Sequence, residues 1–319
     1  MESKIIQSLL KKTGVPNLIE ILSEQLSPGE LQSLLLRVFE IQATRNEPAQ
    51  LLNSYQKNRF VKPSSLSVTQ ILNFDQLAFQ IASAFEAVQL SPLSPLGVCS
   101  ALGTVHQNKV VSALRNTEVL ADSTNALALE AALQRKMLLK DNPKSSQSVK
   151  LCTSHRLVRG QALANPSHTA HFQIFSLVSA GRDQGNFQFE LDQLYEHLSF
   201  YLNLLHSIGP LDLLAKEIKL GITILDPRLK PESIQSALFN KLKSSYPNAL
   251  FYINDSRQRG RGYYETFCFN LDATGQGGFE INLADGGITD WTQQLLQNKK
   301  ERLLISGIGS ELLLKLFKR

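Results

Sequence analysis

The residues best suited to chemistry lie close together in the last quarter of the chain. Residues 259–265 read Arg-Gly-Arg-Gly-Tyr-Tyr-Glu, and residues 266–271 continue as Thr-Phe-Cys-Phe-Asn-Leu, an apolar run typical of a strand. The two arginines supply cationic donors, and the paired tyrosines supply aromatic surfaces and hydroxyl groups, which together suit a small zwitterionic or anionic ligand. The alternative is a solvated basic turn that leads into a strand. The pattern predicts a ligand pocket beside a strand over residues 263–271.

Three further stretches accompany this run in a fixed order. Residues 85–93 (Phe-Glu-Ala-Val-Gln-Leu-Ser-Pro-Leu) read as a helix running into a strand that ends at a proline. Residues 149–159 and 170–175 read as two strands around a polar loop, and residues 305–313 read as a strand, a Gly-x-Gly turn and a helix. These stretches look like motifs 1, 2 and 3 of the class II aminoacyl-tRNA synthetases. Residues 259–264 resemble the Arg-Gly-x-x-Tyr-Tyr signature of histidyl-tRNA synthetases and of their paralogue, the regulatory subunit of ATP phosphoribosyltransferase.

The resemblance implies an α+β fold in which helices flank a mostly antiparallel sheet. The residue pattern agrees, because runs of adjacent strands joined by hairpin-like turns are flanked by helices. We therefore expect a class II synthetase-like, catalytic-type domain at residues 68–319. Periodicity predicts helices over residues 125–139 and 187–206, strands over residues 217–225, 249–254 and 278–283, and a hairpin turn at Asp183-Gln-Gly.

Residues 1–67 are predicted to form a helical N-terminal domain and a linker. Ser27-Pro-Gly-Glu30 has the pattern of a capping box at the start of a helix. Apolar residues at helical spacing form a stripe on this helix and on the first one, and we expect both stripes to bury against each other or against the core. The stripes are Leu31, Leu34, Leu35, Val38 and Phe39, and Ile5, Ile6, Leu9 and Leu10.

Two arginines match the catalytic positions of the family. Amino-acid activation brings a carboxylate to the α-phosphate of ATP, so the site needs fixed cations where negative charge develops. Arg159 stands at the position of the motif 2 arginine, which bridges these two groups in class II enzymes, and Arg259 matches the arginine that histidyl enzymes add beside it. The resemblance therefore implies that both guanidinium groups face one pocket.

The amino-acid side of the pocket is implied by two segments. Residues 120–125 (Leu-Ala-Asp-Ser-Thr-Asn) resemble the Arg-Pro-Glu-Gly-Thr segment of the family, which would place the Asp122 carboxylate against the ammonium of the ligand and the Thr124 hydroxyl beside it. The same residues could form a helix N-cap, and the two roles are compatible. Tyr263 and Tyr264 match the tyrosines that line the amino-acid pocket. The alternative for them is a cross-strand aromatic pair.

The nucleotide side departs from the family. Gln161 stands where motif 2 has an acid that accepts from adenine, and its carbonyl oxygen can still accept there without charge assistance. Leu312 replaces the motif 3 arginine that stacks on adenine and reaches the γ-phosphate. Phe172 could stack on a base or belong to the core. Gly307 and Gly309 form the motif 3 turn. The resemblance thus implies ATP or AMP, with Mg²⁺, as candidate ligands, although this sequence lacks some of the family's nucleotide contacts.

The resemblance also implies a homodimer formed through motif 1. Leu77, Ile81 and Phe85 leave an apolar stripe on the motif 1 helix that needs cover, which agrees with a two-fold dimer. The sequence ends six residues after Leu313, so we expect no anticodon-binding domain of the histidyl type. Charging of full-length tRNA is not expected.

Composition limits the remaining classes of protein. The chain has 319 residues and a formal net charge of +5, with no apolar run of transmembrane length and no signal-peptide pattern. Cys99, Cys152 and Cys268 lie in apolar runs without metal-type spacing, which indicates buried thiols in a reducing compartment. His168 and His171 lack a third ligand nearby, so no structural metal is expected. We expect a cytoplasmic protein with no membrane partner.

Three functional hypotheses follow. The first is a catalytically degenerate synthetase paralogue that binds an amino-acid-like ligand, with or without a nucleotide, and regulates a partner enzyme or senses the ligand. The second is a ligase that still forms an amino-acid adenylate and passes it to an acceptor other than full-length tRNA. The third is a structural scaffold that uses the dimer surface alone. Leu312 separates the first two, because activation would need a residue elsewhere, such as Arg257 or Arg261, to supply the lost cation.

Overall fold

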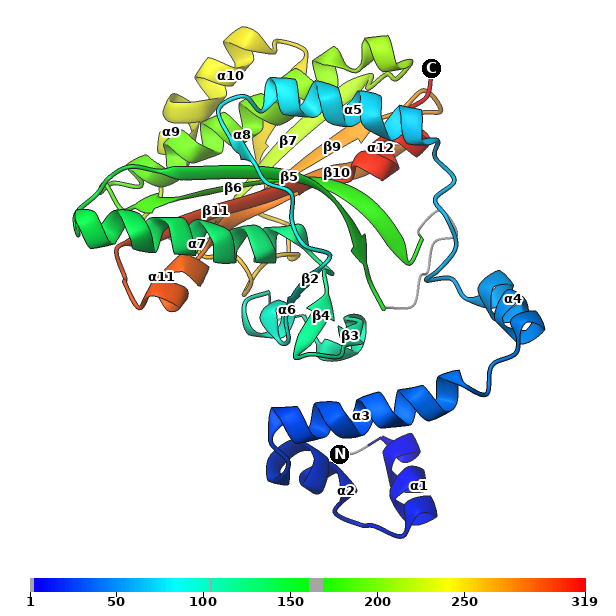
Figure 1. The fold of residues 1–319 in the computed structure, drawn as a ribbon. Helices are drawn as coiled ribbons and strands as arrows, with labels where there is room; N and C mark the ends of the chain where they lie inside the picture. The colour runs from blue at the N-terminus through cyan, green and yellow to red at the C-terminus, as the bar shows by residue number, and fades with distance from the viewer. Residues whose placement is uncertain (1–2, 104, 161–168) are drawn as a thin grey trace.

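The structure is a computed structural model that describes residues 3–103, 105–160 and 169–319. One large sheet runs through the molecule with helices on both faces, and a group of N-terminal helices lies apart from it (Figure 1). Over the described ranges, every helix is too short or too polar to cross a membrane. The arrangement is the mixed helix and sheet architecture that the sequence predicts.

The large sheet has eight strands in the order β1-β5-β6-β11-β10-β9-β7-β8. Its β1–β5 and β7–β8 pairs are parallel and its other five neighbouring pairs are antiparallel, which confirms the prediction of a mostly antiparallel sheet. The bounds are β1 Glu86–Ala87, β5 Val149–Val158, β6 His171–Arg182, β7 Glu217–Ile224, β8 Ala249–Ile253, β9 Phe267–Thr274, β10 Glu280–Thr289 and β11 Glu301–Ile308. A small second sheet consists of β2 Leu93–Pro95, β4 Thr117–Val119 and β3 Ser112–Ala113.

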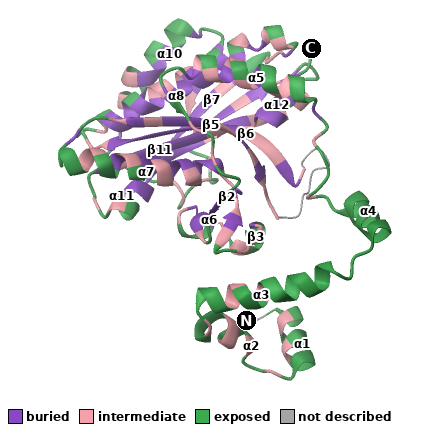
Figure 2. Ribbon diagram, in the orientation of Figure 1, coloured by how far each residue is buried: buried purple, intermediate pink, exposed green. Residues whose placement is uncertain are grey.

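Helices cover the two faces of the large sheet to different extents. One face lies under α5 Val68–Ile81, α8 Gln188–Ser207, α9 Pro231–Ile234, α10 Asn240–Ser245 and α12 Ser310–Leu316, and holds the larger hydrophobic core. The other face lies under α7 Ser123–Asp141 and α11 Trp291–Leu296, and holds a smaller core. Figure 2 shows buried residues along the central strands. The second face is therefore covered by fewer helices and leaves room for a site.

Alternation along the strands decides which side chains reach that second face. On β6, Phe175 and Leu177 join the larger core, whereas Val178 and Ala180 join the smaller one. A register shift between Asn282 and Ala284 interrupts the same alternation on β10. The bulge changes which residues of β10 point toward α7.

Two buried polar contacts tie helices to the sheet. The Arg135 guanidinium of α7 pairs with the Glu301 carboxylate of β11, and both side chains are fully buried. On the other face, His197 Nδ1 of α8 lies 2.7 Å from Ser306 Oγ of β11, and Tyr201 Oη donates to the same oxygen at 2.7 Å. Ser179 of β6 completes this group at 3.0 Å from His197 Nε2. Each helix is thereby fixed in register with the strands beneath it.

The N-terminal helices are α1 Lys4–Thr13, α2 Leu18–Glu20, α3 Pro28–Ala43 and α4 Pro48–Lys57. Ser27 accepts from Glu30 N and Glu30 caps Ser27 N in return, so the predicted capping box is confirmed. The expectation that the apolar stripes are buried is wrong, because α1 to α4 contain no buried residue and Phe39 is 51% exposed (Figure 2). The four helices together enclose too little apolar surface to make a core of their own.

The linker after α4 contacts the sheet domain. Arg59 donates to Gly160 O at 2.9 Å, and Ser64 Oγ donates to the Glu311 carboxylate at 2.7 Å. The backbone oxygen of Lys62 contacts the His171 ring. Ser67 then caps α5, where the predicted catalytic-type domain begins.

Several predicted elements lie within a few residues of those observed, and the exceptions have local causes. The predicted strand over residues 263–271 begins and ends too early, because β9 runs over Phe267–Thr274 and the residues before it form turns. The predicted strand over residues 278–283 is too short, since β10 continues to Thr289 past its bulge. The predicted hairpin at Asp183-Gln-Gly is wrong, because this turn joins β6 to α8.

The motif 1 helix also differs from expectation. Leu77 and Ile81 pack against the larger core, and Phe85 is buried against the His197 ring. The stripe predicted to need cover is therefore covered within the chain. The large apolar side chains that α5 exposes are Val68 and Leu72, at 71% and 61%.

Candidate ligand-binding site

A cavity of about 410 Å³ opens on the face of the large sheet that carries α7. Strands β6, β10 and β11 form its floor, and its walls come from the start of α7, from the segment before β3 and from the loop before β9. This volume lies in the range of ordinary small-molecule pockets. Its lining includes Asp122, Thr124, Arg159, Arg257, Arg259, Tyr263, Tyr264, Asp285 and Gly307.

The loop that carries the two tyrosines is a series of tight turns. Gly260 and Gly262 have φ of +90° and +77°, which favours glycine, and the amides of Tyr263 and Tyr264 both donate to Gly260 O. These turns explain why the strand begins only at Phe267. Tyr264 packs so closely on Gly287 of β10 that a Cβ there would lie 2.6 Å from the ring.

The tyrosines form an aromatic wall in that loop. Their rings are perpendicular at a centroid distance of 4.7 Å, and Tyr263 makes a second edge contact with Trp291 at 5.8 Å. They are consecutive loop residues, so the cross-strand alternative is wrong. Burial raises the pKa of both hydroxyls, with a further contribution from Asp122 at Tyr263 and from Asp285 at Tyr264. Both hydroxyls thus remain protonated at neutral pH and can donate.

Arg159 and Asp122 lie together at the opposite wall. Arg159 Nε donates to Ala121 O at 2.9 Å, its Nη2 lies 3.6 Å from Asp122 Oδ2, and its guanidinium lies 5.1 Å from the centre of the Phe172 ring. Asp122 is the N-cap of α7 and accepts from Thr124 N and Oγ1. Asp122 therefore both caps α7 and lines the cavity, and its Oδ2 points toward Arg159.

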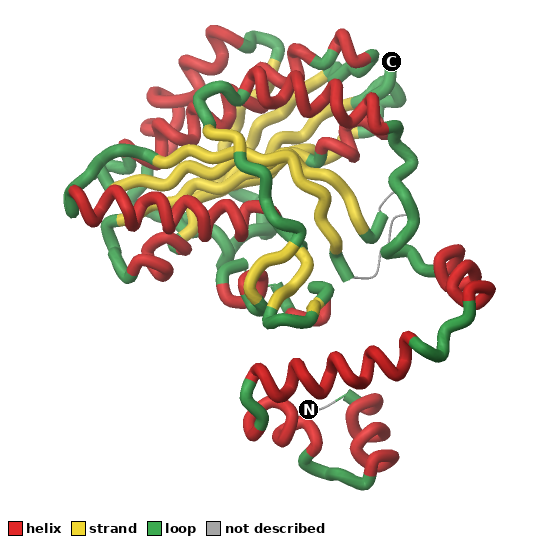
Figure 3. The backbone as a smooth tube through the Cα atoms, viewed as in Figure 1, coloured by secondary structure: helices red, strands yellow, loops and turns green. Residues whose placement is uncertain are grey.

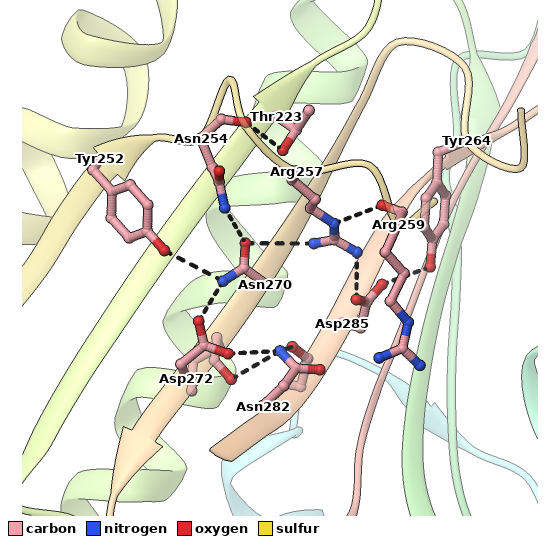
Figure 4. A network of polar contacts seen from close by, with 12 residues as sticks. Thr223, Tyr252, Asn254, Arg257, Arg259, Tyr264, Asn270, Asp272, Asn282 and Asp285 are labelled. Carbon is pink, nitrogen blue, oxygen red and sulfur yellow. Dashed lines mark hydrogen bonds and ion pairs between the residues drawn. The ribbon is translucent and has the colours of Figure 1, made fainter. Parts of the chain in front are cut away.

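A polar network holds the remaining arginines, and the sequence pattern did not predict it (Figure 4). Arg257 Nη2 lies 2.5 Å from Asp285 Oδ2, its Nε donates to Arg259 O at 2.7 Å, and Tyr264 Oη donates to Asp285 Oδ1 at 3.0 Å. Burial raises the pKa of Asp285, while Arg257 opposes that shift. Because of the bulge on β10, the alternation of side chains along the strand does not predict that Asp285 faces the cavity. Its position directly before Gly286-Gly287 was the only local signal.

The cavity is cationic over its described lining. Its charged residues are Lys109, Arg159, Arg257 and Arg259 against Asp122 and Asp285. Two of the arginines face these carboxylates. In the part of the chain that the structure describes, the Arg259 guanidinium has no hydrogen-bond or ion-pair partner, and the residue is exposed. An anionic group of a ligand is the natural partner for it.

Comparison with known proteins adds the decisive observation on the fold. No protein-family model matches the sequence, and no curated protein matches it. Among solved structures, an ATP phosphoribosyltransferase regulatory subunit/histidyl-tRNA synthetase from Bacillus halodurans superposes with a TM-score of 0.58 and 13% identity, over 82% of this chain and 83% of that one. This chain has a class II aminoacyl-tRNA synthetase-like fold. Apo histidyl-tRNA synthetase from S. aureus gives 0.57 and 16%, over 79% and 67%.

A third match supports the same fold. A histidine–tRNA ligase subunit from Alicyclobacillus acidocaldarius has a TM-score of 0.56 at 10% identity, over 79% of this chain and 94% of that one. At these identities the likeness shows the fold alone. The class II fold accounts for the meeting of motif 2, motif 3 and the tyrosine loop at one face of the sheet.

Not every residue expected in a class II site reaches the cavity. Gly307 lines it, whereas Gly309 lies at the start of α12 and Phe172 lies behind Arg159, both outside its lining. Gln161 falls outside the described residues. Leu312 packs against Gly309 and the larger core, and does not line the cavity.

Neither Arg257 nor Arg261 is free to replace the cation that Leu312 lacks. The Arg257 guanidinium is bonded to Asp285 and to Arg259 O. Arg261 donates to the backbone oxygens of Arg257 and Asp255 and does not line the cavity. The two arginines considered as substitutes therefore do not supply the missing ATP contact. Over the described residues no group of three or more His, Cys, Asp or Glu could hold a metal.

Proposed function

We propose that this chain is a class II synthetase paralogue that binds an amino-acid-like ligand in the cavity and serves a regulatory or sensing role. The observation that carries the proposal is that the cavity unites Arg159 and Arg259 with Asp122 and two tyrosines, while Leu312 lies away from it. Relative to the class II family, the chain retains the groups that would bind a zwitterion but lacks the motif 3 arginine used in ATP chemistry. Binding without activation is the function that this combination supports best.

Each side chain has a distinct task in the proposed complex. The Arg259 guanidinium receives the carboxylate of the ligand, because it is otherwise without a partner among the described residues. The Asp122 carboxylate receives the ammonium, and the Thr124 hydroxyl lies beside it. Tyr263 and Tyr264 form the aromatic wall, and Tyr263 offers a hydroxyl donor, since the Tyr264 hydroxyl already donates to Asp285. ATP or AMP, with Mg²⁺, is kept only as a second ligand to be screened.

The proposal extends to assembly and partners. The Bacillus halodurans protein is named in part as a regulatory subunit, and a regulated partner enzyme is proposed here by analogy. A two-fold homodimer through motif 1 is also proposed, supported by the exposed Val68 and Leu72 on α5. Charging of full-length tRNA is not part of the proposal.

A second function has one observation in its favour. Arg159 and Arg259 both line the cavity, and an enzyme that forms an aminoacyl adenylate needs two such cations near the reacting carboxylate. Such an enzyme would release pyrophosphate from ATP and pass the amino acid to another acceptor. Exchange of pyrophosphate into ATP separates this function from simple binding.

The test combines two measurements on the full chain. A thermal-shift screen of the twenty amino acids, each with and without ATP, should show at least one that raises Tm, because a ligand of the folded state adds RT ln(1 + [L]/Kd) of stability. Pyrophosphate exchange should stay at background for all twenty. Robust exchange would replace the regulatory proposal by the adenylating one. A screen in which no amino acid binds would leave only a scaffold.

A further inference from the structure

The sequence offers three arginines in a span of five residues, and the structure gives each a different environment. The side chain of Arg257 is only 7% exposed, whereas Arg259 and Arg261 are exposed residues. Arg261 bonds backbone oxygens of its own loop and lies outside the cavity lining. Arg257 and Arg259 both line the cavity, so something must determine which of the two guanidinium groups remains free for a ligand.

Asp285 lies where it can pair with one of the two arginines and leave the other free. It rises from β10 between the two arginines of the cavity wall, as Figure 4 shows, and its side chain is 31% exposed. Its Oδ2 accepts from Arg257 Nη2 at 2.5 Å, and its Oδ1 accepts from Tyr264 Oη at 3.0 Å. One carboxylate thus binds the loop at two points, through Arg257 just before the Arg-Gly-Arg-Gly-Tyr-Tyr run and through Tyr264 at its end.

The other donors of Arg257 reinforce the same arrangement. Its Nε donates to the backbone oxygen of Arg259 at 2.7 Å, which fixes the peptide that carries the neighbouring guanidinium. Its Nη1 lies 3.5 Å from Asn270 Oδ1, and Asn254 donates to that same oxygen at 3.3 Å. A planar, three-sided donor of this kind fixes a loop more firmly than a lysine could.

We propose that Asp285 is a positioning residue that engages Arg257 and thereby leaves Arg259 as the arginine presented to the ligand. The inference rests on the proposed ligand-binding function, but its test needs no ligand. Without the Asp285 carboxylate, the Arg257 guanidinium loses its charged partner and the loop over residues 255–266 loses two of its anchors on β10. Arg257 and Arg259 would then compete for the same cavity.

The experiment uses Asp285→Asn, Arg257→Met and the double variant in the full chain, with Asp272→Asn as the matched control. Asp272 belongs to the same polar network, through Asn270 and Asn282, but contacts neither arginine and does not line the cavity. Accessible arginines are modified with phenylglyoxal and located by peptide mass mapping. Fully buried Arg135 serves as an internal reference for global unfolding.

In the unsubstituted chain, Arg259 should react and Arg257 should be protected. In Asp285→Asn, Arg257 should react at a rate close to that of Arg259 while Arg135 stays unmodified. Hydrogen exchange of residues 255–266 should rise by roughly ten- to a hundredfold in each single variant, as expected from losing a charged hydrogen bond, and no further in the double variant. Asp272→Asn should leave both readouts unchanged.

Two results would overturn the proposal. Continued protection of Arg257 in Asp285→Asn would show that the carboxylate does not hold it, and modification of Arg135 in the same variant would show a general loss of stability. If Arg257 responds as expected but the amino-acid screen is negative, the positioning of the loop stands and the proposed ligand-binding function fails. If an amino acid binds but Arg257 stays protected in Asp285→Asn, the ligand site stands and the positioning role of Asp285 fails.

Discussion

The guanidinium of Arg135 forms a two-pronged ion pair with the carboxylate of Glu301, at 2.7 Å and 2.9 Å, and neither side chain is exposed. Two further donors of Arg135 reach the backbone oxygens of Gln147 and Ser145. The pair joins α7, whose start carries Asp122 and Thr124, to β11. It therefore sets the distance between a wall of the cavity and its floor.

Removing one partner of this pair should be costly. We expect Glu301→Gln to lower the free energy of unfolding by about 3–5 kcal/mol, because it leaves the Arg135 charge buried and uncompensated. Urea denaturation measures the loss. The control is Glu196→Gln, which breaks a partly exposed pair with Lys150 and should cost no more than about 1 kcal/mol. Equal losses in the two variants would contradict the role assigned to burial.

Stability should fall in mild acid because of His197. Burial lowers the pKa of this histidine to about 3, from an ordinary value of 6.5. Above pH 6.5 the histidine is neutral in both the folded and the unfolded state and costs no stability. Between about pH 6.5 and 3 the unfolded state binds a proton that the folded state does not, so the free energy of unfolding decreases as the pH falls through this range. We expect several kcal/mol of stability to be lost across this window.

The variant His197→Gln separates this group from the carboxylates that also titrate in acid. It keeps polar atoms near Ser306 but cannot take up the proton, so its stability should depend less on pH between about 6.5 and 4. Chemical denaturation at a series of pH values gives both profiles. Parallel profiles would mean that His197 is not the source of the acid sensitivity.

Arg259→Ala should weaken binding of the amino acid that gives the largest thermal shift by roughly ten- to a hundredfold, the range expected for one charged hydrogen bond. Arg261→Ala is the matched control, because Arg261 lies in the same loop and does not line the cavity. Isothermal titration gives both affinities. An equal loss in the control would point to general electrostatics and not to a specific contact.

The two roles of Asp122 can be separated by choice of substitution. Asp122→Asn keeps a good N-cap for α7 but removes the carboxylate, so ligand affinity should fall while thermal stability is kept. Asp122→Ala removes both and should also cost about 1 kcal/mol of stability. If Asp122→Asn binds the ligand as well as the unsubstituted chain, Asp122 is a cap alone.

The proposed dimer gives a prediction for solution assembly. Sedimentation at micromolar concentration should show a two-fold dimer, and Leu72→Lys should shift it toward monomer, since a charge in an apolar contact is unfavourable. Leu36→Lys on α3 is a control at an exposed apolar position outside motif 1. A monomeric unsubstituted chain would count against assembly through motif 1.

Local sequence determined the elements and the identity of most groups in the cavity. The apolar spacing of residues 187–206 and the cap before residue 123 are properties of neighbours in the chain, and α8 and α7 lie close to their predicted bounds. The order of the motif-like stretches also pointed to the class II fold. The resemblance to the class II family named Arg159, Arg259, Asp122, Thr124, Tyr263, Tyr264 and Gly307 as site residues, and all seven line one cavity.

Only the tertiary structure decided how the charges are partnered. The bulge between Asn282 and Ala284 shifts the alternation on β10, so no sequence period places Asp285 beside Arg257. The turns at Gly260 and Gly262 convert the start of a predicted strand into the loop that carries the two tyrosines. Residue type and spacing predict which cations are available. Which cation stays free depends on contacts between strands distant in sequence, because an ion pair forms only where the fold brings its partners together.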